Sequence, residues 1–314
     1  MKRNLDLYNE YLESCYALHW ETKDTTYVTY KSYMTQFIKY LKEFENDRYL
    51  ISKDTIKTIV PILERYINYC RAKGNHAVNI KNKIVALSSF YKWCVRRGKI
   101  EYHPFNDKID RIKVTPQDKV RKEYYLTWKQ IFTVEILMEQ NKRFDLRSKL
   151  LWQLFLDSGF RISAIHSLKL SQLDMENGCF YNVKEKMGKI RTLYFYSSTK
   201  ELMLKYLAER EKKGVDTDYI FYIKHYGEWK QMSRIAIRKR VRKMGELIGI
   251  KDLYPHSLRK TSVNNVSRLL DVKSASEFAG HNSTTVTENC YIQKQTEEIQ
   301  RDRILLMRKN TGLI

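Results

Sequence analysis

The amino-acid sequence predicts a mainly α protein of two domains: a helical N-terminal domain, and a mixed α+β domain that holds a small antiparallel sheet. Three observations predict this fold. The 314 residues are too many for one small core and suit two. Apolar residues recur at helical spacing through the first third of the chain. Residues 179–183 and 190–196 are rich in aromatic and β-branched side chains and flank a turn of lysine and glycine, which is typical of paired strands.

The first domain is expected to cover residues 1–108. Its apolar residues form three helical stripes, the second of which follows Pro61, a residue that fits the first turn of a helix. The third stripe ends at a basic stretch closed by Gly98, as helix C-termini often do. The sequence therefore predicts a helical domain without strands.

A charged and weakly periodic stretch, 109–125, is expected to be an interdomain linker, with the second domain at 126–314. The first helix of that domain should begin at Thr127, because Thr127 and Gln130 have the spacing of a capping box. Two apolar helices should meet near Gly159. After the strands, helices are expected at five segments: 199–212, 233–247, 256–269, 273–279 and 295–309.

Charge is the strongest signal in the composition. Lys and Arg number 58 against 36 acidic residues, which gives a net charge of +22. Such a surplus favours a polyanionic partner, nucleic acid before an anionic membrane surface, and a merely lysine-rich composition does not explain it. No apolar run approaches the roughly 18 residues of a membrane span, and the N-terminus does not resemble a secretory signal. We therefore expect a cytoplasmic, nucleoid-associated protein with no membrane contact.

The five cysteines are scattered, and none has the spacing of a zinc ligand set. This pattern predicts free thiols in a reducing compartment. We expect the protein to work without a metal ion or another cofactor.

Five polar residues stand out by their settings. Arg161 lies between two apolar helices, so it either needs an anionic partner or extends from a helix start into solvent. His256 and Arg259 are three residues apart after a proline and share one helix face, which places a possible proton carrier beside a phosphate ligand. His281 follows a glycine at a predicted helix end. Tyr291 is one of 23 tyrosines, and only the polar residues that precede it in the chain distinguish it from the others.

The order of these residues resembles the motif set of the tyrosine recombinase, or phage integrase, family. That set is Arg, Lys, His-x-x-Arg, Gly-His and Tyr; here it reads Gly-Phe-Arg161-Ile-Ser, Pro-His256-Ser-Leu-Arg259, Gly-His281 and Tyr291. The resemblance covers the chain from about residue 125 to the end. The first domain is similar to the family's core-binding domain in size and helix content. The resemblance implies a Xer/Cre-like recombinase of two domains, without an arm-binding domain.

The same resemblance implies a catalytic lysine in the turn between the two strands. Aligning 189–191 with the family's Lys-x-Arg ending places that lysine at Lys186, with Lys184 and Lys189 as alternatives.

The interval from His281 to Tyr291 is one residue longer than is usual in the family, and the loop 282–285 can take up the extra residue. No tyrosine follows Tyr291, so it is the only candidate in the expected window. Whether Tyr291 acts in its own protomer's site or in a neighbour's stays open.

These side chains suit DNA strand transfer without metal or ATP. Attack on a phosphodiester builds negative charge on phosphorus oxygens, which Arg161 and Arg259 would neutralise and His281 would hydrogen-bond. Tyr291 would attack phosphorus, with His256 either taking its proton or mainly positioning it. The turn lysine would protonate the departing 5′ oxygen. The resemblance implies a 3′-phosphotyrosyl intermediate and rejoining through a four-way junction.

The segment from Ser233 to Glu246 carries a run of cations that we expect to lie along a DNA duplex, mostly on phosphates. Its cations are Arg234, Arg238, Lys239, Arg240, Arg242 and Lys243. In the first domain, Lys81 and Lys92 lie off an apolar stripe and either contact phosphates or form a solvated face. With the first domain on the opposite side of the duplex, the two domains would form a C-shaped clamp.

The resemblance implies as partner double-stranded DNA with an inverted-repeat core site, bound by a homo-oligomer with a dimer on each site and a tetramer in synapsis. The tail, 296–307, would pack on a neighbouring protomer or on its own domain. Two other functions remain open from the sequence: a type IB topoisomerase, which would relax DNA without a specific site, and a basic DNA-binding protein without catalytic activity.

Overall fold

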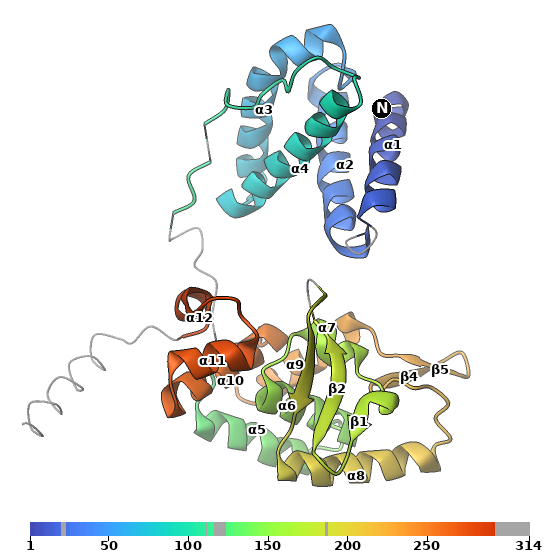
Figure 1. Cartoon of the computed structure of the whole chain (residues 1–314), viewed down its shortest axis with the longest axis vertical. Helices are drawn as coiled ribbons and strands as arrows, with labels where there is room; N and C mark the ends of the chain where they lie inside the picture. Colours follow the sequence, from blue (N-terminus) through green and yellow to red (C-terminus); the bar gives the residue numbers. More distant parts are fainter. Residues whose placement is uncertain (20–22, 111, 116–123, 186–187, 293–314) are drawn as a thin grey trace, which may run out of the picture. The chain divides into compact units, whose positions relative to one another are not determined.

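The computed structural model describes five stretches of the chain: 1–19, 23–110, 112–115, 124–185 and 188–292. The chain forms two compact units, residues 1–121 and 122–314, and each has its own hydrophobic core (Figure 1). The predicted mainly α fold is confirmed, because helices dominate both units and the described strands all lie in the second. The predicted linker and the predicted helix at 295–309 fall partly or wholly outside the described residues.

The first unit is helical throughout its regular structure. Its elements are α1 (Lys2–Leu18), a π-helical turn (Lys23–Tyr27), α2 (Val28–Phe44), α3 (Lys53–Ala72) and α4 (Ala77–Arg96). Its core is rich in aromatic rings, and Tyr11, Phe37, Tyr66 and Phe90 are all almost completely buried. The rings of Phe37 and Tyr66 pack edge to face, 4.9 Å apart. Such contacts between aromatic rings stabilise a core beyond the burial of area alone.

Helix α3 does not begin at Pro61, so that prediction is wrong. The helix is capped at Ser52, whose Oγ accepts a hydrogen bond from the backbone N–H of Thr55 at 3.3 Å, and Pro61 lies in its interior. A proline inside a helix removes one backbone hydrogen bond. Burial of the adjacent Ile62 and Leu63 in the core offsets this loss.

The second unit places helices around two small antiparallel sheets (Figure 1). Its first half holds α5 (Trp128–Gln140), α6 (Leu146–Ser158), α7 (Ile162–Ser167), a 3₁₀ turn (Leu170–Gln172), β1 (Leu173–Asp174), β2 (Cys179–Lys184) and β3 (Ile190–Tyr194). Its second half holds α8 (Ser197–Lys212), β4 (Tyr222–His225), β5 (Glu228–Gln231), α9 (Arg234–Glu246), α10 (Pro255–Leu269), α11 (Val272–Ala279) and α12 (Thr284–Cys290). The first sheet has the order β1-β2-β3. The predicted pairing of β2 with β3 is present and antiparallel.

The capping box predicted at Thr127 is present. Gln130 donates its backbone N–H to Thr127 Oγ1 at 3.2 Å, and the Gln130 side chain accepts the Thr127 N–H at 2.9 Å. The core of the unit is centred on α6, where Leu150, Trp152 and Phe155 are fully buried.

The β4–β5 hairpin was not predicted from the sequence. Its two-residue turn, Tyr226-Gly227, has positive φ at both positions, 49° and 85°, as a type I′ turn requires. Asparagine or aspartate usually stands where this chain has Tyr226. The strands are also short and half polar, so neither the turn nor the pattern identifies them.

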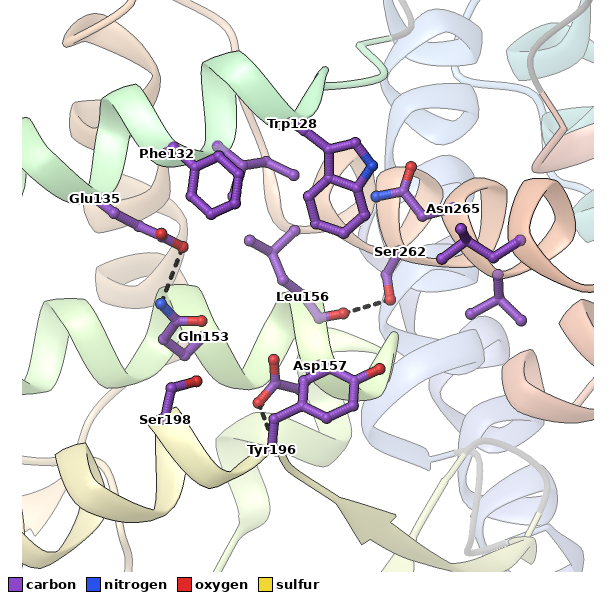
Figure 2. Close-up of a pocket in the computed structure, with 13 residues that line it drawn as sticks. Trp128, Phe132, Glu135, Gln153, Leu156, Asp157, Tyr196, Ser198, Ser262 and Asn265 are labelled. Atoms are coloured by element: carbon purple, nitrogen blue, oxygen red, sulfur yellow. Dashed lines mark hydrogen bonds between the residues drawn. The ribbon is translucent and has the colours of Figure 1, made fainter.

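A pocket of about 340 Å³ lies among α5, α6, the start of α8 and α10 (Figure 2). Trp128 and Phe132 stack at its rim with ring centroids 6.2 Å apart, and both are more than half exposed. Burial raises the pKa of the Glu135 and Asp157 carboxyls, which also line it. None of the candidate catalytic residues that the structure describes lines this pocket.

Among the described residues, no helix is both long and apolar enough to cross a membrane. Four cysteines are buried as free thiols: Cys15, Cys70, Cys94 and Cys179.

Candidate active site

Five of the six predicted catalytic residues come together in the second unit. Arg161 is the N-cap residue of α7, His256 and Arg259 lie in the first turns of α10, His281 follows α11, and Tyr291 follows α12. The sixth, Lys186, lies outside the described residues.

Arg259 is the centre of this cluster, and its side chain is fully buried. Its Nε donates to the Tyr291 hydroxyl at 3.2 Å, and its Nη2 donates to the Ala279 carbonyl at 2.8 Å. Nη1 donates to the Gly159 carbonyl, and Nη2 also lies 3.1 Å from Nε2 of His281. Burial lowers the pKa of the Arg259 guanidinium, which nevertheless remains charged at any physiological pH. The buried Arg259 therefore connects three segments of the chain and contacts two candidate catalytic side chains, His281 and Tyr291.

His281 is neutral in this arrangement. Because a guanidinium only donates, the Arg259 contact requires Nε2 of His281 to accept. The ring proton then lies on Nδ1 and is donated to Thr287 Oγ1 at 2.7 Å. Burial, with the positive charges of Arg259 and Arg161, lowers the pKa of His281 to about 4. Nε2 of His281 is thus an acceptor in this arrangement, whereas the sequence predicts that His281 donates a hydrogen bond to phosphate.

Tyr291 is 5% exposed and packs in its own unit against Val263, Ala275 and Ala279. Its ring is close to two imidazoles, with ring centroids 5.3 Å from His256 and 4.5 Å from His281. The Arg259 guanidinium lies 5.2 Å from the ring centroid. The hydroxyl of Tyr291, the candidate nucleophile, is therefore hydrogen-bonded to an arginine of the same chain.

The segment before Tyr291 is helical where a loop was expected. Helix α12 begins at Thr284 and is capped by Ser283. The prediction of a loop over 282–285 is therefore wrong for its last two residues, which are helical. Threonine-rich sequences have low helix propensity, which hides this helix in the sequence. Tyr291 is the C-cap residue of α12, and its N–H donates to the Thr287 carbonyl at 2.9 Å.

Arg161 has an anionic partner, the first of the two alternatives that the sequence left open. Its Nη1 donates to Oε1 of Glu185 at 3.2 Å, and the Glu185 side chain is fully buried while that of Arg161 is 30% exposed. The other carboxylate oxygen of Glu185 accepts from Arg191 Nη1 at 3.4 Å. Glu185 and Arg191 were not identified from the sequence, because the turn was interpreted only for its lysines.

Two cations link the start of β3 to the end of α11: Lys189, directly before the strand, and Arg191 within it. Arg191 donates through Nη2 to the carbonyls of Glu277 at 3.2 Å and Phe278 at 2.9 Å. Lys189 donates to the Gly280 carbonyl at 3.1 Å and also to Asn282. Lys189, an alternative for the catalytic lysine, is thus engaged in holding the segment that carries His281. Lys184, the other alternative, is exposed.

Two glycines are required by close approaches at this site. Gly280 has φ +65°, and a Cβ there would lie 2.5 Å from Nη1 of Arg191. Gly159 has φ +58°, and its Cβ would lie 2.6 Å from a ring carbon of Phe278. Both positions favour glycine by backbone conformation as well as by space.

The cations predicted to contact DNA are exposed, with one exception. Arg234, Arg238, Lys239 and Arg242 project from α9 into solvent, and Lys81 and Lys92 are exposed on α4 of the first unit. Arg240 instead donates to Asp145 at 3.1 Å and to Ser148 at 2.7 Å at the start of α6. The Arg240 side chain is therefore paired within its own unit, because its position on α9 faces α6.

No cluster of metal-binding side chains occurs among the described residues.

Comparisons with known proteins agree with this geometry. The sequence model of the phage integrase family matches residues 126–298. A tyrosine recombinase XerC of Thermodesulfovibrio yellowstonii is 25% identical over 284 residues, covering 82% of this chain and 90% of the relative. Among solved structures, the Tn1549 transposon integrase in complex with transposon right end DNA has a TM-score of 0.67 at 17% identity, over 93% of this chain and 96% of that one. A lambda integrase dimer bound to a COC′ core site has a TM-score of 0.63 at 18% identity, over 93% and 79%.

Proposed function

This chain belongs to the phage integrase family and is a tyrosine site-specific recombinase, and we propose that Tyr291 is the nucleophile with which it cuts and rejoins DNA. The observation that carries this assignment is the hydrogen bond from the buried Arg259 to the Tyr291 hydroxyl. A donor with full positive charge stabilises negative charge on the phenolic oxygen as it attacks.

The reaction exchanges one phosphoester for another. The Tyr291 oxygen forms a bond to phosphorus, the bond from phosphorus to the 5′ oxygen breaks, and the product is a 3′-phosphotyrosyl strand with a free 5′ hydroxyl. Arg259 and the exposed part of Arg161 neutralise the charge that develops on the non-bridging oxygens. Since the ester energy is retained, a second attack by another 5′ hydroxyl rejoins the strands without ATP. Two such exchanges pass through a four-way junction.

The histidines serve proton transfer and charge stabilisation. His256 is exposed beside the Tyr291 ring, where it accepts the phenolic proton. When a phosphate oxygen accepts hydrogen bonds from the Arg259 guanidinium, Nε2 of His281 loses its contact with Nη2 of Arg259. Thr287 Oγ1 can donate to Nδ1 as readily as accept from it, so this contact also supports the tautomer in which Nε2 donates to phosphate. We assign the protonation of the leaving oxygen to Lys186. The hydrogen bond from Lys189 to the Gly280 carbonyl supports this choice, because it engages the alternative lysine in a structural contact.

We further propose that the exposed cations of α9 lie on DNA phosphates. The double variant Arg238→Ala/Arg242→Ala should bind DNA more weakly, with the slope of log affinity against log salt reduced by about two. The measurement is fluorescence anisotropy with a DNA duplex over a range of salt concentrations. The matched control is Lys205→Ala/Lys212→Ala, which removes two exposed cations of α8. Equal slopes in both double variants would contradict the role of α9.

The partner is proposed to be double-stranded DNA with an inverted-repeat core site, bound by one dimer on each site and by a tetramer in synapsis. The lambda integrase dimer bound to a core site supports the dimer on each site. Lys81 and Lys92 are proposed to contact phosphates from the first domain, residues 1–108, on the opposite side of the duplex. The site of action is proposed to be the nucleoid in the cytoplasm.

The proposed function is tested with a core site obtained by selecting bound duplexes from a random library. A nick near the cleavage position lets the cut strand end diffuse away and traps the intermediate. We expect a protein–DNA adduct on a denaturing gel, and recombinant products from a plasmid with two sites. Relaxation of a plasmid without the site, together with no recombinant product, would instead identify a topoisomerase.

A further inference from the structure

One carboxylate lies inside a cluster of cations at the active site. The Glu185 side chain is fully buried, and its two oxygens accept hydrogen bonds from Arg161 and Arg191. A buried carboxylate is costly to desolvate unless it is paired, and removal of one partner from such a pair leaves an uncompensated charge. The burial of Glu185 between two guanidiniums therefore indicates that its negative charge has a task at this position.

A backbone irregularity turns Glu185 inward. Strand β2 has a register shift between Phe180 and Val183, and Asn182 has φ +54°. Side chains of a regular strand alternate, so Phe180 pointing inward would place Val183 and Glu185 on the outer face. The bulge reverses this, and Val183 and Glu185 are both buried.

The contact with Arg161 uses a small part of that guanidinium. Glu185 occupies Nη1 of Arg161, one nitrogen of a planar group that has five N–H donors. The Arg161 side chain stays 30% exposed. The carboxylate therefore fixes the plane of Arg161 and leaves further donors for the oxygens of a phosphate.

The second contact ties this arginine to the remainder of the site. Arg191 pairs with Glu185 and donates to two carbonyls at the end of α11, next to Gly280-His281. Its guanidinium also lies 4.8 Å from the ring centroid of Phe160, the residue before Arg161. Glu185 thus links α7, β3 and the segment that carries His281, and it offsets repulsion among cations before DNA binds.

We propose that Glu185 is a positioning residue for strand cleavage, which holds Arg161 in the orientation that receives the scissile phosphate. This inference rests on the proposed function. Glu185 acts through Arg161 and does not touch the reacting atoms. Its loss should therefore lower the rate of cleavage and leave DNA binding unchanged, because most DNA affinity comes from other phosphate contacts.

The test is single-turnover cleavage of the nicked core site by the full chain. Glu185→Gln keeps the shape and one acceptor but removes the charge, and we expect cleavage to slow by about 10- to 100-fold with the dissociation constant for DNA changed by less than about two-fold. Glu185→Asp keeps the charge and should restore part of the rate. Glu201→Gln, an exposed glutamate on α8, is the matched control and should cleave like the wild type.

A double-mutant cycle separates positioning from a general structural role. In the Arg161→Ala background, Glu185→Gln should slow cleavage by less than about two-fold further, because the residue it positions is gone. Thermal melting checks that each variant is folded; if Glu185→Gln is not, Glu185→Asp takes its place in the cycle. Independent, multiplying losses in the cycle would overturn the inference. So would wild-type cleavage by a folded Glu185→Gln variant, or cleavage by Glu185→Asp that is no faster than cleavage by Glu185→Gln. Absence of an adduct with the wild type would instead refute the proposed function.

Discussion

Tyr291→Phe is expected to abolish the covalent protein–DNA adduct, because the variant has no oxygen to attack phosphorus. Phenylalanine retains the ring that lies close to His256 and His281, so the fold and the affinity for DNA should persist. The substitution removes the hydrogen bond from Arg259 Nε to the hydroxyl, which costs about 1–3 kcal/mol if no water replaces it. The measurement is adduct yield on the nicked core site by denaturing gel, with binding measured in parallel.

Tyr226→Phe is the control for this experiment. Tyr226 is 93% exposed in the β4–β5 turn and should be dispensable for cleavage. If the Tyr291→Phe protein still formed an adduct, another residue would be the nucleophile and the assignment would be wrong.

Arg259→Lys should impair both cleavage and stability, although the substitution keeps the charge. A lysine ammonium cannot reach the two carbonyls, the hydroxyl and the imidazole that the guanidinium contacts together. We expect cleavage to fall by about 100- to 1,000-fold, as for the loss of one donor to a developing oxyanion. We expect the free energy of unfolding to fall by about 2–4 kcal/mol, because buried carbonyls lose their donor.

Leu150→Ala separates these two effects. Leu150 is fully buried in α6, so its truncation should cost about 2–5 kcal/mol of stability. Cleavage by this variant should stay near the wild-type rate at a temperature at which both proteins are folded. Denaturant unfolding and single-turnover cleavage, measured on the same preparations, distinguish the variants. Equal losses of cleavage in both would show that Arg259 acts only through stability.

The sequence predicted those parts of the fold that depend on local patterns. The capping box at Thr127 and the pairing of β2 with β3 follow from short-range signals, and both are present. Pro61 shows the limit of such signals, because a favourable core overrode the usual place of proline in a helix. The β4–β5 hairpin was missed because Tyr226 stands where a turn residue is usual.

The site could be anticipated in its residue types but not in its connections. The position of Arg161 between apolar helices left two alternatives open, an anionic partner or extension into solvent. That the anion is Glu185 depends on a bulge in β2, and no strand pattern indicates a bulge in advance. In the same way, Arg240 belongs to a basic run in the sequence, and only the packing of α9 on α6 assigns it to Asp145. Contacts between distant segments decided both cases.

The burial of Tyr291 also affects how safely a cut strand can be kept. A phosphotyrosyl ester is open to hydrolysis, and a water molecule that reached phosphorus would leave a break in the DNA strand. Tyr291 is 5% exposed, its ring lies close to the imidazoles of His256 and His281, and Arg259 donates to its oxygen, so bulk water has little access to the proposed position of that ester. With Tyr291 as the proposed nucleophile, the side chains that bury it would favour attack on the intermediate by a DNA hydroxyl over attack by water.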